Sequence, residues 1–440
     1  MMHISGSRKY PTEVFLIDES IDPEEFIIAT YALYGNPKDY LTLTGALALE
    51  QTTGTWVPVA EETPEVRRKH GGKAVSAFEV GIPKKEEGQP RIFVIKIAFP
   101  IVNLGYQIPE VLSAVFGNIS MGGNLKLLDL QFPKSFTEHF TGPNFGIEGV
   151  RKILGVWDRP LVMTMTKPCT GIPPSVVAKL FYESTRGGVD IVKDDELLAD
   201  PSYCDFKSRL KAVLEVQKKA EEETGEKKLY AINVTDEVNL MIDKARWAVE
   251  NGVNCIMVNV FATGFSGLRA LAEDKKINVP LVAHPCMSGA YYGSPYTGIN
   301  WSLLFGKFLR LSGADMVVYP SAYGKIPLSR EDYLRVAQTL QVPFHNLKPA
   351  FPGPAAGTYP GMAPTFINEL GIDFMMSAGG AIHGHPMGPA AGGKAMRQAI
   401  EVAMQGRNLR DAAKEYKELK AAIELWGIYG EDVVKFELKA

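Results

Sequence analysis

Four consecutive ionisable residues follow a short apolar run in the segment GGVDIVKDDE, which spans residues 187–196. Strand-like alternation sends Lys193 and Asp195 to the same side, and Glu196 joins them if the strand ends and bends there. Carboxylate oxygens with a few waters suit Mg²⁺, so the cluster predicts a magnesium site. A protonated lysine cannot be a metal ligand. Lys193 therefore either neutralises the carboxylates in a salt-bridged cluster or is converted into an oxygen donor, as in the carbamate that a neutral amine forms with CO₂.

Other polar or glycine-rich segments also follow apolar runs elsewhere in the chain. Lys167 lies in MTKPCTG, His284 in AHPCMSG and Lys325 in PSAYGKIP, and two later runs lead into PGPAAGTYPG and SAGGAIHGHPMG. Each segment alone has an ordinary explanation, such as a solvated charge, a buried histidine or a turn. Because all of them follow apolar runs, we expect them to meet in one site.

The residue types in these segments indicate a reaction class. Backbone N–H groups of Gly357, Gly379 and Gly380 can approach an anion without interference from side chains, so we expect them to bind phosphate. Lys167 lies among apolar neighbours and other cations, and we expect its pKa to be lowered so that it can transfer a proton. The combination predicts metal-assisted proton abstraction beside a carbonyl group of a phosphorylated substrate, with Mg²⁺ stabilising the enediolate.

A regular framework is needed to bring these residues together. From about residue 150 onward, short apolar runs alternate with longer runs of helical periodicity. This pattern predicts an α/β fold, a (β/α)₈ TIM barrel with its active site at the carboxyl ends of the strands. The alternative is an open doubly wound sheet, which is less favoured because no GxGxxG follows the first strand. The expected strands lie at residues 160–166, 189–193, 229–234, 255–260, 280–284, 315–320, 347–351 and 373–378.

Residues 1–148 lack this rhythm and predict a separate N-terminal α+β domain of ferredoxin-like form, so the barrel takes residues 149–440. A charged helical tail, at about 409–440, is expected to pack outside the barrel. Within the first domain, the expected strands are VFLIDESI (14–21), AFEVGI (77–82) and RIFVIKIAFP (91–100), and the expected helices are PEEFIIATYAL (23–33) and IPEVLSAVFG (108–117).

Bulk properties exclude several classes of protein. The 440 residues carry a formal net charge of −3, which argues against electrostatic binding to nucleic acid or to anionic membranes. No apolar run has membrane-spanning length, and the first residues lack the apolar core of a signal peptide. The four cysteines are scattered, without a CxxC pair, as is typical of a reduced cytoplasmic protein.

Taken together, the motifs resemble the RuBisCO large-subunit superfamily. The resemblance implies that Lys193 is carbamylated and that Asp195 and Glu196 complete an Mg²⁺ site. It further implies that Lys167 transfers the proton during enolisation, that His284 is the histidine of strand five, and that Lys325 lies on the mobile loop six. The segment AGGAIHGHPMG corresponds to the phosphate loop of strand eight.

The resemblance also implies an obligate dimer. EQTTGTW and FGNISMGG are similar to segments that the family inserts into the neighbouring subunit's site. Glu50, Thr55, Trp56 and Asn118 are therefore expected to come from the partner subunit, in a homodimer or an assembly of dimers.

Several positions depart from the pattern of the carboxylating enzyme. Cys169 replaces a second lysine of that enzyme, and Pro285 replaces an arginine that binds a second phosphate. Ser288 replaces a second histidine, and Ala355 replaces a serine. The histidine of strand six is replaced by Val318 or Tyr319. A bisphosphate needs cations or donors at both ends. We therefore expect a phosphorylated substrate with one phosphate group, whose other end is apolar or uncharged and is lined by Pro285, Met287 and Tyr323.

These departures are typical of RuBisCO-like proteins, which keep metal-assisted enolisation and do not fix CO₂. The expected activity is that of a 2,3-diketo-5-methylthiopentyl 1-phosphate enolase of methionine salvage or of a 5-methylthioribulose 1-phosphate isomerase. Asn118 stands where the salvage enolase has a lysine base, which leaves Lys167 as the expected base. Two alternatives remain: a ribulose 1,5-bisphosphate carboxylase or a decarboxylase of a phosphorylated 3-keto sugar acid, and a non-catalytic sugar-phosphate-binding protein.

Overall fold

A computed structural model of the chain describes residues 11–54, 57, 59–81, 91–326 and 328–432. The chain forms two compact units, one of residues 1–140 and 287–304 and the other of residues 141–286 and 305–440. The first unit therefore includes a segment, 287–304, that the sequence analysis assigned to the barrel. No helix in the described ranges is both long and apolar enough to cross a membrane.

The first unit has the β-α-β-β-α-β order of a ferredoxin-like domain. Its sheet has the strand order β10-β4-β1-β3-β2, and the pairs β1–β3, β1–β4 and β2–β3 are antiparallel. β10 adds a short parallel pair with β4 and makes the sheet mixed. The elements are β1 (Phe26–Gly35), α1 (Tyr40–Glu50), α2 (Pro64–His70), β2 (Lys73–Glu79), β3 (Arg91–Pro100), α3 (Ile108–Phe116), β4 (Leu125–Gln131) and β10 (Gly298–Ile299).

Two sequence-based expectations for this unit are wrong. The run 23–33, expected to be a helix, contains most of β1, because its β-branched and aromatic side chains favour a pleated strand whose burial alternates. The run 14–21, expected to be a strand, makes one isolated bridge, Phe15 to Ala74. It begins at the end of one 3₁₀ turn, Thr12–Val14, and contains a second, Asp18–Ser20.

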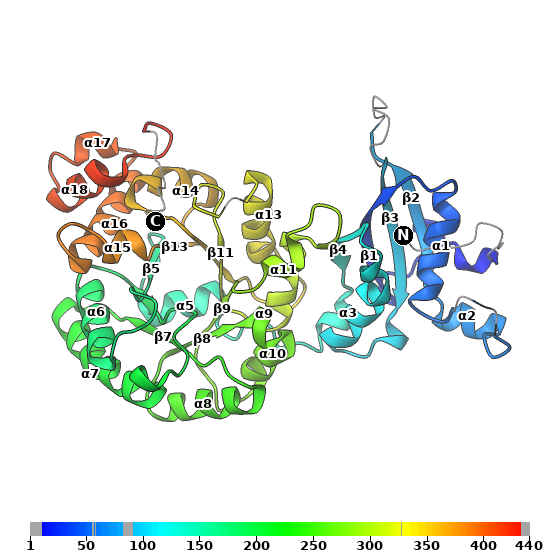
Figure 1. The fold of residues 1–440 in the computed structure, drawn as a ribbon, viewed down its shortest axis with the longest axis horizontal. Coiled ribbons are helices and arrows are strands. Elements are labelled where there is room, and N and C mark those ends of the chain that lie inside the picture. Colours follow the sequence, from blue (N-terminus) through cyan, green and yellow to red (C-terminus); the bar gives the residue numbers. More distant parts are fainter. Residues whose placement is uncertain (1–10, 55–56, 58, 82–90, 327, 433–440) are drawn as a thin grey trace. The chain divides into compact units, whose positions relative to one another are not determined.

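The second unit is a parallel eight-stranded barrel surrounded by helices (Figure 1). The sheet order is β12-β11-β9-β8-β7-β6-β5-β13, so strands that follow one another in the chain are neighbours in space. The strands are β5 (Leu161–Met165), β6 (Ile191–Lys193), β7 (Leu229–Asn233), β8 (Cys255–Asn259), β9 (Leu281–His284), β11 (Met316–Pro320), β12 (Phe351–Ala355) and β13 (Met375–Ser377).

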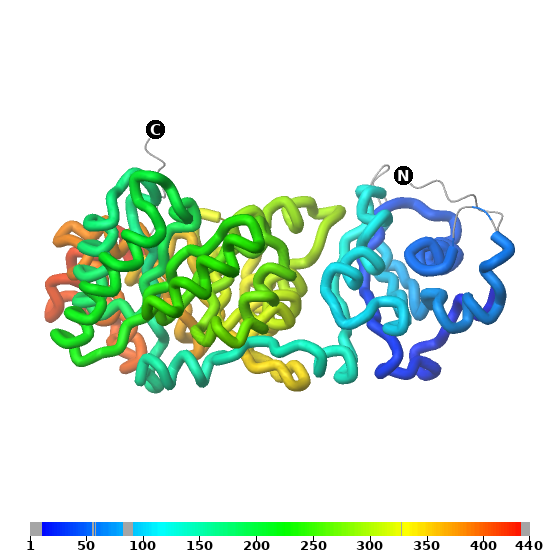
Figure 2. The backbone as a smooth tube through the Cα atoms, turned by 90° about the horizontal axis from the view of Figure 1, so that it is seen from below, coloured from blue at the N-terminus to red at the C-terminus, as the bar shows by residue number. Residues whose placement is uncertain are grey.

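Most helices of this unit connect the strands and cover the outside of the barrel, whereas the first one precedes the first barrel strand and adds Val150 and Leu154 to the core. They are α5 (Gly146–Leu154), α6 (Pro174–Arg186), α7 (Phe206–Thr224), α8 (Val238–Glu250), α9 (Val260–Thr263), α10 (Phe265–Glu273), α12 (Phe308–Leu311), α13 (Arg330–Gln341), α14 (Ala363–Leu370), α15 (Gly380–His383) and α16 (Pro389–Met404). The expected tail contains α17 (Leu409–Ala412) and α18 (Lys417–Trp426), which Figure 1 shows beside α16 and outside the strands. In the tube of Figure 2, the red tail again lies beside the orange segment.

The barrel interior is filled by alternate residues of its strands. Met163, Ala231, Met257 and Val318 belong to this core, and Leu154 of α5 packs against it. The residues between them along each strand face the surrounding helices. This alternation decides which polar residues at the strand ends point into the barrel.

The seventh barrel strand lies at Phe351–Ala355, about four residues after the expected 347–351. Its sequence, FPGPA, was taken for part of a loop because proline removes a backbone donor. The N–H of Phe351 donates to the carbonyl of Asp315, the residue before β11. Because backbone groups alternate in direction along a strand, the nitrogens of Pro352 and Pro354 point to the opposite side, toward β13. In the described residues, no ladder of hydrogen bonds joins β12 to β13, so the two prolines interrupt none. The barrel is therefore nearly closed rather than fully closed.

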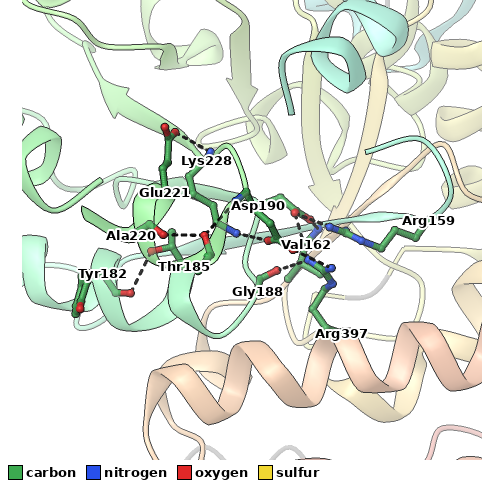
Figure 3. Close-up of polar contacts among 12 residues, drawn as sticks. Arg159, Val162, Tyr182, Thr185, Gly188, Asp190, Ala220, Glu221, Lys228 and Arg397 are labelled. Carbon is green, nitrogen blue, oxygen red and sulfur yellow. Dashed lines mark hydrogen bonds and ion pairs between the residues drawn. The ribbon is translucent and has the colours of Figure 1, made fainter. Parts of the chain in front are cut away.

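A buried charge cluster ties the amino-terminal end of β6 to its neighbours (Figure 3). Asp190 is 1% exposed and accepts two hydrogen bonds from the guanidinium of Arg159, both of 2.7 Å, and one of 2.8 Å from the N–H of Val162. Arg397 of α16 lies 3.5 Å from the same carboxylate. Burial works against the charge of Asp190, but the two guanidinium groups nevertheless hold its pKa below the usual value. This carboxylate therefore joins β5, β6 and α16 at the end of the barrel opposite the predicted site.

We expect Asp190→Ala to lower the free energy of unfolding by about 3–5 kcal/mol, because Arg159 would keep its buried charge without its partner. Chemical denaturation monitored by circular dichroism measures the loss. The exposed Asp158 supplies the control, since Asp158→Ala should change stability by less than about 0.5 kcal/mol. Equal effects of the two substitutions would contradict this account.

Candidate active site

Strand alternation brings Lys193 and Asp195 to the inner side of β6 and sends Asp194 outward. Ile191, two residues before Lys193, belongs to the barrel core. Asp194 instead meets Arg209 of α7, whose Nε donates to it at 3.0 Å, and neither side chain is exposed. Asp194 also accepts hydrogen bonds from the Tyr230 hydroxyl, at 2.8 Å, and from the N–H of Asn233, at 3.0 Å. The three consecutive acids of KDDE therefore divide into one supporting carboxylate and two that face the site.

Lys193 is fully buried at the end of β6. Its Nζ lies 3.2 Å from Glu196 Oε2 and donates to the Asp194 carbonyl at 2.9 Å. Burial lowers the pKa of Lys193, although the carboxylates of Glu196 and Asp195 oppose the change. Burial conversely disfavours the charge of Glu196, but the Lys193 ammonium outweighs it and holds the pKa of Glu196 at about 2. The pair is a buried lysine beside a firmly ionised carboxylate.

Lys167 follows β5 and reaches the second carboxylate. Its Nζ donates to Asp195 Oδ2 at 2.5 Å and to Cys169 Sγ at 3.0 Å. Burial works against its charge, but the hydrogen bonds to Asp195 and Cys169 prevail and raise the pKa of Lys167. The expectation of a lowered pKa is therefore wrong for this arrangement, because the sequence does not show that Asp195 is the partner.

His284 ends β9 and completes the cluster. Its Nε2 lies 3.3 Å from Glu196 Oε2, and its Nδ1 accepts the N–H of Cys286 at 3.2 Å. Burial and the charge of Lys193 lower the pKa of His284 to about 3, so the ring is neutral at physiological pH. Because Nδ1 is an acceptor, the ring hydrogen lies on Nε2 and faces Glu196.

Two asparagines that the sequence analysis did not select hold the backbone of this cluster. Asn233, the last residue of β7, donates to the carbonyls of Asp195 and Glu196 at 3.2 and 3.3 Å. Asn259, the last residue of β8, donates to the Glu196 carbonyl at 2.9 Å. Each is the polar residue that closes an apolar strand on its inward-facing side, which is the signal that could have revealed them.

The predicted glycine loops lie at the same ends of the strands. A β-carbon at Gly379 would lie 2.4 Å from Met165 Sδ and 3.2 Å from Lys167 Cε, so the loop after β13 packs directly on the end of β5. A β-carbon on Gly380 would meet open space. Gly357 has a φ of +115°, and its β-carbon would lie 2.9 Å from the N–H nitrogen of Lys325. Close approach of the loops after β11 and β12 thus requires glycine there.

Among the other predicted residues, Lys325 follows β11 and two others belong to the first unit. The side chain of Lys325 is exposed, and its N–H donates to the Ala356 carbonyl at 2.6 Å. In the first unit, Glu50 ends α1 and the exposed Asn118 begins a 3₁₀ turn, while Gln51 joins the two segments through a hydrogen bond of 3.4 Å from the N–H of Ile119. Thr55 and Trp56 lie outside the described residues.

The residues expected to line the apolar end of a substrate differ in their surroundings. Pro285 is half-buried after β9, and Met287 is exposed in the first unit. The Tyr323 hydroxyl donates to Glu369 Oε1 at 2.6 Å. That hydroxyl is therefore already bonded within the barrel unit.

The donor set fits a hard cation only if Lys193 changes chemically. Among the described residues, no group of three histidine, cysteine or acidic side chains is arranged to hold a metal ion. Asp195 and Glu196 supply carboxylates, and the third side chain beside them is Lys193, which becomes an oxygen donor only as a carbamate. The buried amine with a lowered pKa suits that reaction, because CO₂ combines with the neutral form. The residues present thus fit a magnesium ion together with CO₂.

Unpaired polar groups mark the same end of the barrel. A buried polar group without a partner usually indicates a bound water or ligand. Within the described ranges, five residues that carry such groups follow or end barrel strands: Thr166, Asn259, Ser321, Thr358 and His383.

Comparison with known families agrees with this geometry. Residues 146–426 match the catalytic domain of the ribulose bisphosphate carboxylase large chain, and residues 16–136 match its N-terminal domain. The chain belongs to the RuBisCO large-chain family. The predicted family membership and the predicted combination of barrel and α+β domain are thereby confirmed.

Relatives of this chain within the RuBisCO family include proteins that are not named as carboxylases. A ribulose bisphosphate carboxylase-like protein of Archaeoglobus fulgidus is 51% identical, over 93% of this chain and 95% of its own length. A 2,3-diketo-5-methylthiopentyl-1-phosphate enolase of Geobacillus thermodenitrificans is 42% identical, over 91% and 98%.

Two solved structures share the fold over almost the whole chain. The RuBisCO-like protein MtnW of Alicyclobacillus acidocaldarius has a TM-score of 0.85 at 37% identity, covering 92% of this chain and 100% of that one. The dimeric archaeal RuBisCO of Hyperthermus butylicus has a TM-score of 0.85 at 31% identity, covering 95% and 100%. The chain is thus similar both to a carboxylase and to proteins named for other roles.

The buried pair Arg209–Asp194 supports the site from the outer side of the barrel. A double-mutant cycle tests whether the two residues stabilise the protein as a pair. We expect Arg209→Met to cost about 3–5 kcal/mol of unfolding free energy, because Asp194 would remain charged and buried. Asp194→Asn added to Arg209→Met should recover part of that loss, giving a coupling energy of about 1 kcal/mol or more. Urea denaturation of the four proteins measures it, and purely additive effects would show that the pair does not act as a unit.

Proposed function

We propose that the protein is an Mg²⁺-dependent enzyme that enolises a phosphorylated keto compound. One observation carries the proposal: a fully buried Lys193 lies 3.2 Å from Glu196, directly beside the ion pair of Lys167 with Asp195. A lysine that served only stability would not need two inward-facing carboxylates and a second lysine at the catalytic end of a barrel.

Charge balance supports a carbamate at Lys193. In the present arrangement, the ammonium groups of Lys193 and Lys167 match the carboxylates of Glu196 and Asp195. Conversion of Lys193 from ammonium to carbamate would change its formal charge from +1 to −1, and one divalent cation restores neutrality. The carbamate, Asp195 and Glu196 would hold Mg²⁺, which when bound stabilises negative charge on the oxygen of an enolate.

Lys167 is the proposed base. It would accept a proton only as the neutral amine, and its hydrogen bond to Asp195 now keeps it charged. Neutralisation of Asp195 by another cation would remove that support and lower the pKa of Lys167. In the reaction, the C–H bond beside the carbonyl breaks, Lys167 takes the proton, and the electron pair moves to the carbonyl oxygen. That oxygen then takes a proton from water to give the enol.

The proposed substrate carries one phosphate. The backbone N–H groups of Gly357, Gly379 and Gly380 would bind that phosphate, and the open space beside Gly380 supports this role. Pro285 and Ser288 stand where the carboxylating enzyme has cationic or imidazole groups, so we infer an uncharged opposite end. The relatives named 2,3-diketo-5-methylthiopentyl-1-phosphate enolase act on a compound of this type, in which the carbon beside a carbonyl bears the phosphate.

The complete site is proposed to need a homodimer. Glu50, Thr55, Trp56 and Asn118 would come from the partner subunit, as the motifs of the first unit suggest. The RuBisCO of Hyperthermus butylicus, which shares the fold and is dimeric, supports this proposal. Asn118 carries no basic group, which is why the base role falls to Lys167.

Solvent deuterium exchange tests the proposed enolisation. We expect the wild-type protein, supplied with Mg²⁺ and bicarbonate, to exchange the hydrogen on C1 of 2,3-diketo-5-methylthiopentyl 1-phosphate. Lys167→Ala should slow the exchange by about 10²-fold or more, because general base catalysis is lost. Proton NMR follows the signal of C1 with time.

Lys276→Ala is the matched control, because Lys276 is an exposed lysine before β9, and its rate should equal that of the wild type. Exchange that persists unchanged in Lys167→Ala would remove this lysine from the base role. A wild type that exchanges no hydrogen of any phosphorylated keto compound would refute the function itself.

A further inference from the structure

His383 lies beside Lys167, although its segment was selected only for its glycines. It is the last residue of the short helix α15, and its N–H donates to the Gly379 carbonyl at 3.0 Å. Gly379 in turn packs against the side chains of Met165 and Lys167. The Met165 carbonyl and the charge of Lys167 both act on the His383 ring, so the ring lies near the end of β5.

The ring nitrogens of His383 are buried and have no hydrogen-bond partner among the residues that the structure describes. One nearby acceptor, the Met165 carbonyl, acts to raise the pKa of the ring, but it does not meet the geometry of a hydrogen bond. Even a bond to that carbonyl would leave the second nitrogen without a partner. Unpaired nitrogens in this position lower the stability of the protein unless a bound molecule satisfies them.

His385, two residues later, shows what a structural histidine looks like in the same loop. Its Nε2 lies 3.0 Å from the Glu418 carbonyl, and its Nδ1 accepts the N–H of Met387 at 3.1 Å. Both of its nitrogens are thus bonded within the chain. The contrast suggests that the ring nitrogens of His383 bind a molecule that is not part of the protein, such as a substrate.

The protonation state of His383 limits what it can do. Burial, helped by the charge of Lys167, lowers its pKa to about 4, so the ring is neutral near pH 7. A neutral imidazole has one N–H donor and one acceptor nitrogen. It does not neutralise a phosphate as a cation would, but it can donate a hydrogen bond to a carbonyl oxygen.

We propose that His383 is a further catalytic residue, whose imidazole N–H hydrogen bonds the substrate carbonyl oxygen next to the carbon from which Lys167 removes the proton. This inference rests on the proposed enolisation. As the C–H bond breaks and the electron pair moves to oxygen, the hydrogen bond strengthens, and the imidazole keeps its own proton. Neutral imidazoles with a lowered pKa act as electrophiles in this way in other barrel enzymes.

Two substitutions separate this role from a structural one. His383→Leu removes both nitrogens at similar volume, and His383→Gln keeps a donor group. We expect His383→Leu to slow the deuterium exchange of 2,3-diketo-5-methylthiopentyl 1-phosphate by about 10²-fold, as loss of one oxyanion donor does. His383→Gln should restore part of the rate.

Thermal unfolding in the absence of substrate provides the second readout. Because the ring nitrogens have no hydrogen-bond partner in the part of the chain that the structure describes, His383→Leu should unfold at a Tm equal to or above that of the wild type. The matched control His385→Leu should lower the Tm, because Met387 and Glu418 lose a partner. A structural role for His383 would instead lower the Tm in both variants.

The outcomes are distinguishable. Wild-type exchange that continues at the same rate in His383→Leu would overturn the inference and leave the proposed function standing. A marked fall in Tm for His383→Leu would also overturn it, since the nitrogens would then be bonded within the protein. Absence of exchange in the wild type would refute the proposed function and this inference with it, whereas slow exchange with an unchanged Tm supports both.

Discussion

The buried ammonium of Lys193 is the constraint on which the arrangement of the site depends. A single charge in a protein interior is unfavourable unless neighbouring charges and hydrogen bonds compensate it. Here Lys193 faces Glu196, Lys167 faces Asp195, and Arg209 faces Asp194 on the outer side of the same segment. Each acid of residues 194–196 is therefore matched by one cation, which is local only in the case of Lys193. Under the proposed function, this cluster would exchange the ammonium of Lys193 for a carbamate and a divalent cation.

The barrel positions this cluster through strand alternation. One face of β6 presents Lys193 and Asp195 to the interior, above the apolar residues that fill the barrel, and the other face presents Asp194 to α7. The same alternation places Asn233, Asn259 and His284 at the ends of the next strands. Charge pairs at the opposite end of the barrel, such as that of Asp190 with Arg159, fix the strands without facing the site. The division between a stabilising end and a reactive end is typical of this architecture.

Much of this could be predicted from the sequence, because it follows from short-range patterns. Apolar runs bounded by polar residues located seven of the eight barrel strands, and the spacing of Lys193 and Asp195 predicted their shared side. The seventh strand was misplaced because its two prolines resemble a loop, and only the neighbouring strands show that their nitrogens need no partner. The run 23–33 was predicted to be a helix, but its β-branched and aromatic residues form most of β1.

Properties that depend on distant partners were not predictable. The pKa of Lys167 was expected to be lowered, but Asp195, 28 positions away in the chain, raises it. The role of Asn233 depends on carbonyl groups of another strand. The pairing state of His383 likewise depends on what surrounds the ring in space, and no local pattern distinguishes it from His385.

Carbon-13 NMR of the protein in labelled bicarbonate tests the central claim most directly. With Mg²⁺ present, the account predicts one carbamate carbonyl resonance, which should be absent from Lys193→Arg and retained in Lys167→Ala. Isothermal titration should show Mg²⁺ binding to the wild type only when CO₂ is supplied. Tight Mg²⁺ binding without CO₂, or a carbamate signal that survives Lys193→Arg, would contradict the account.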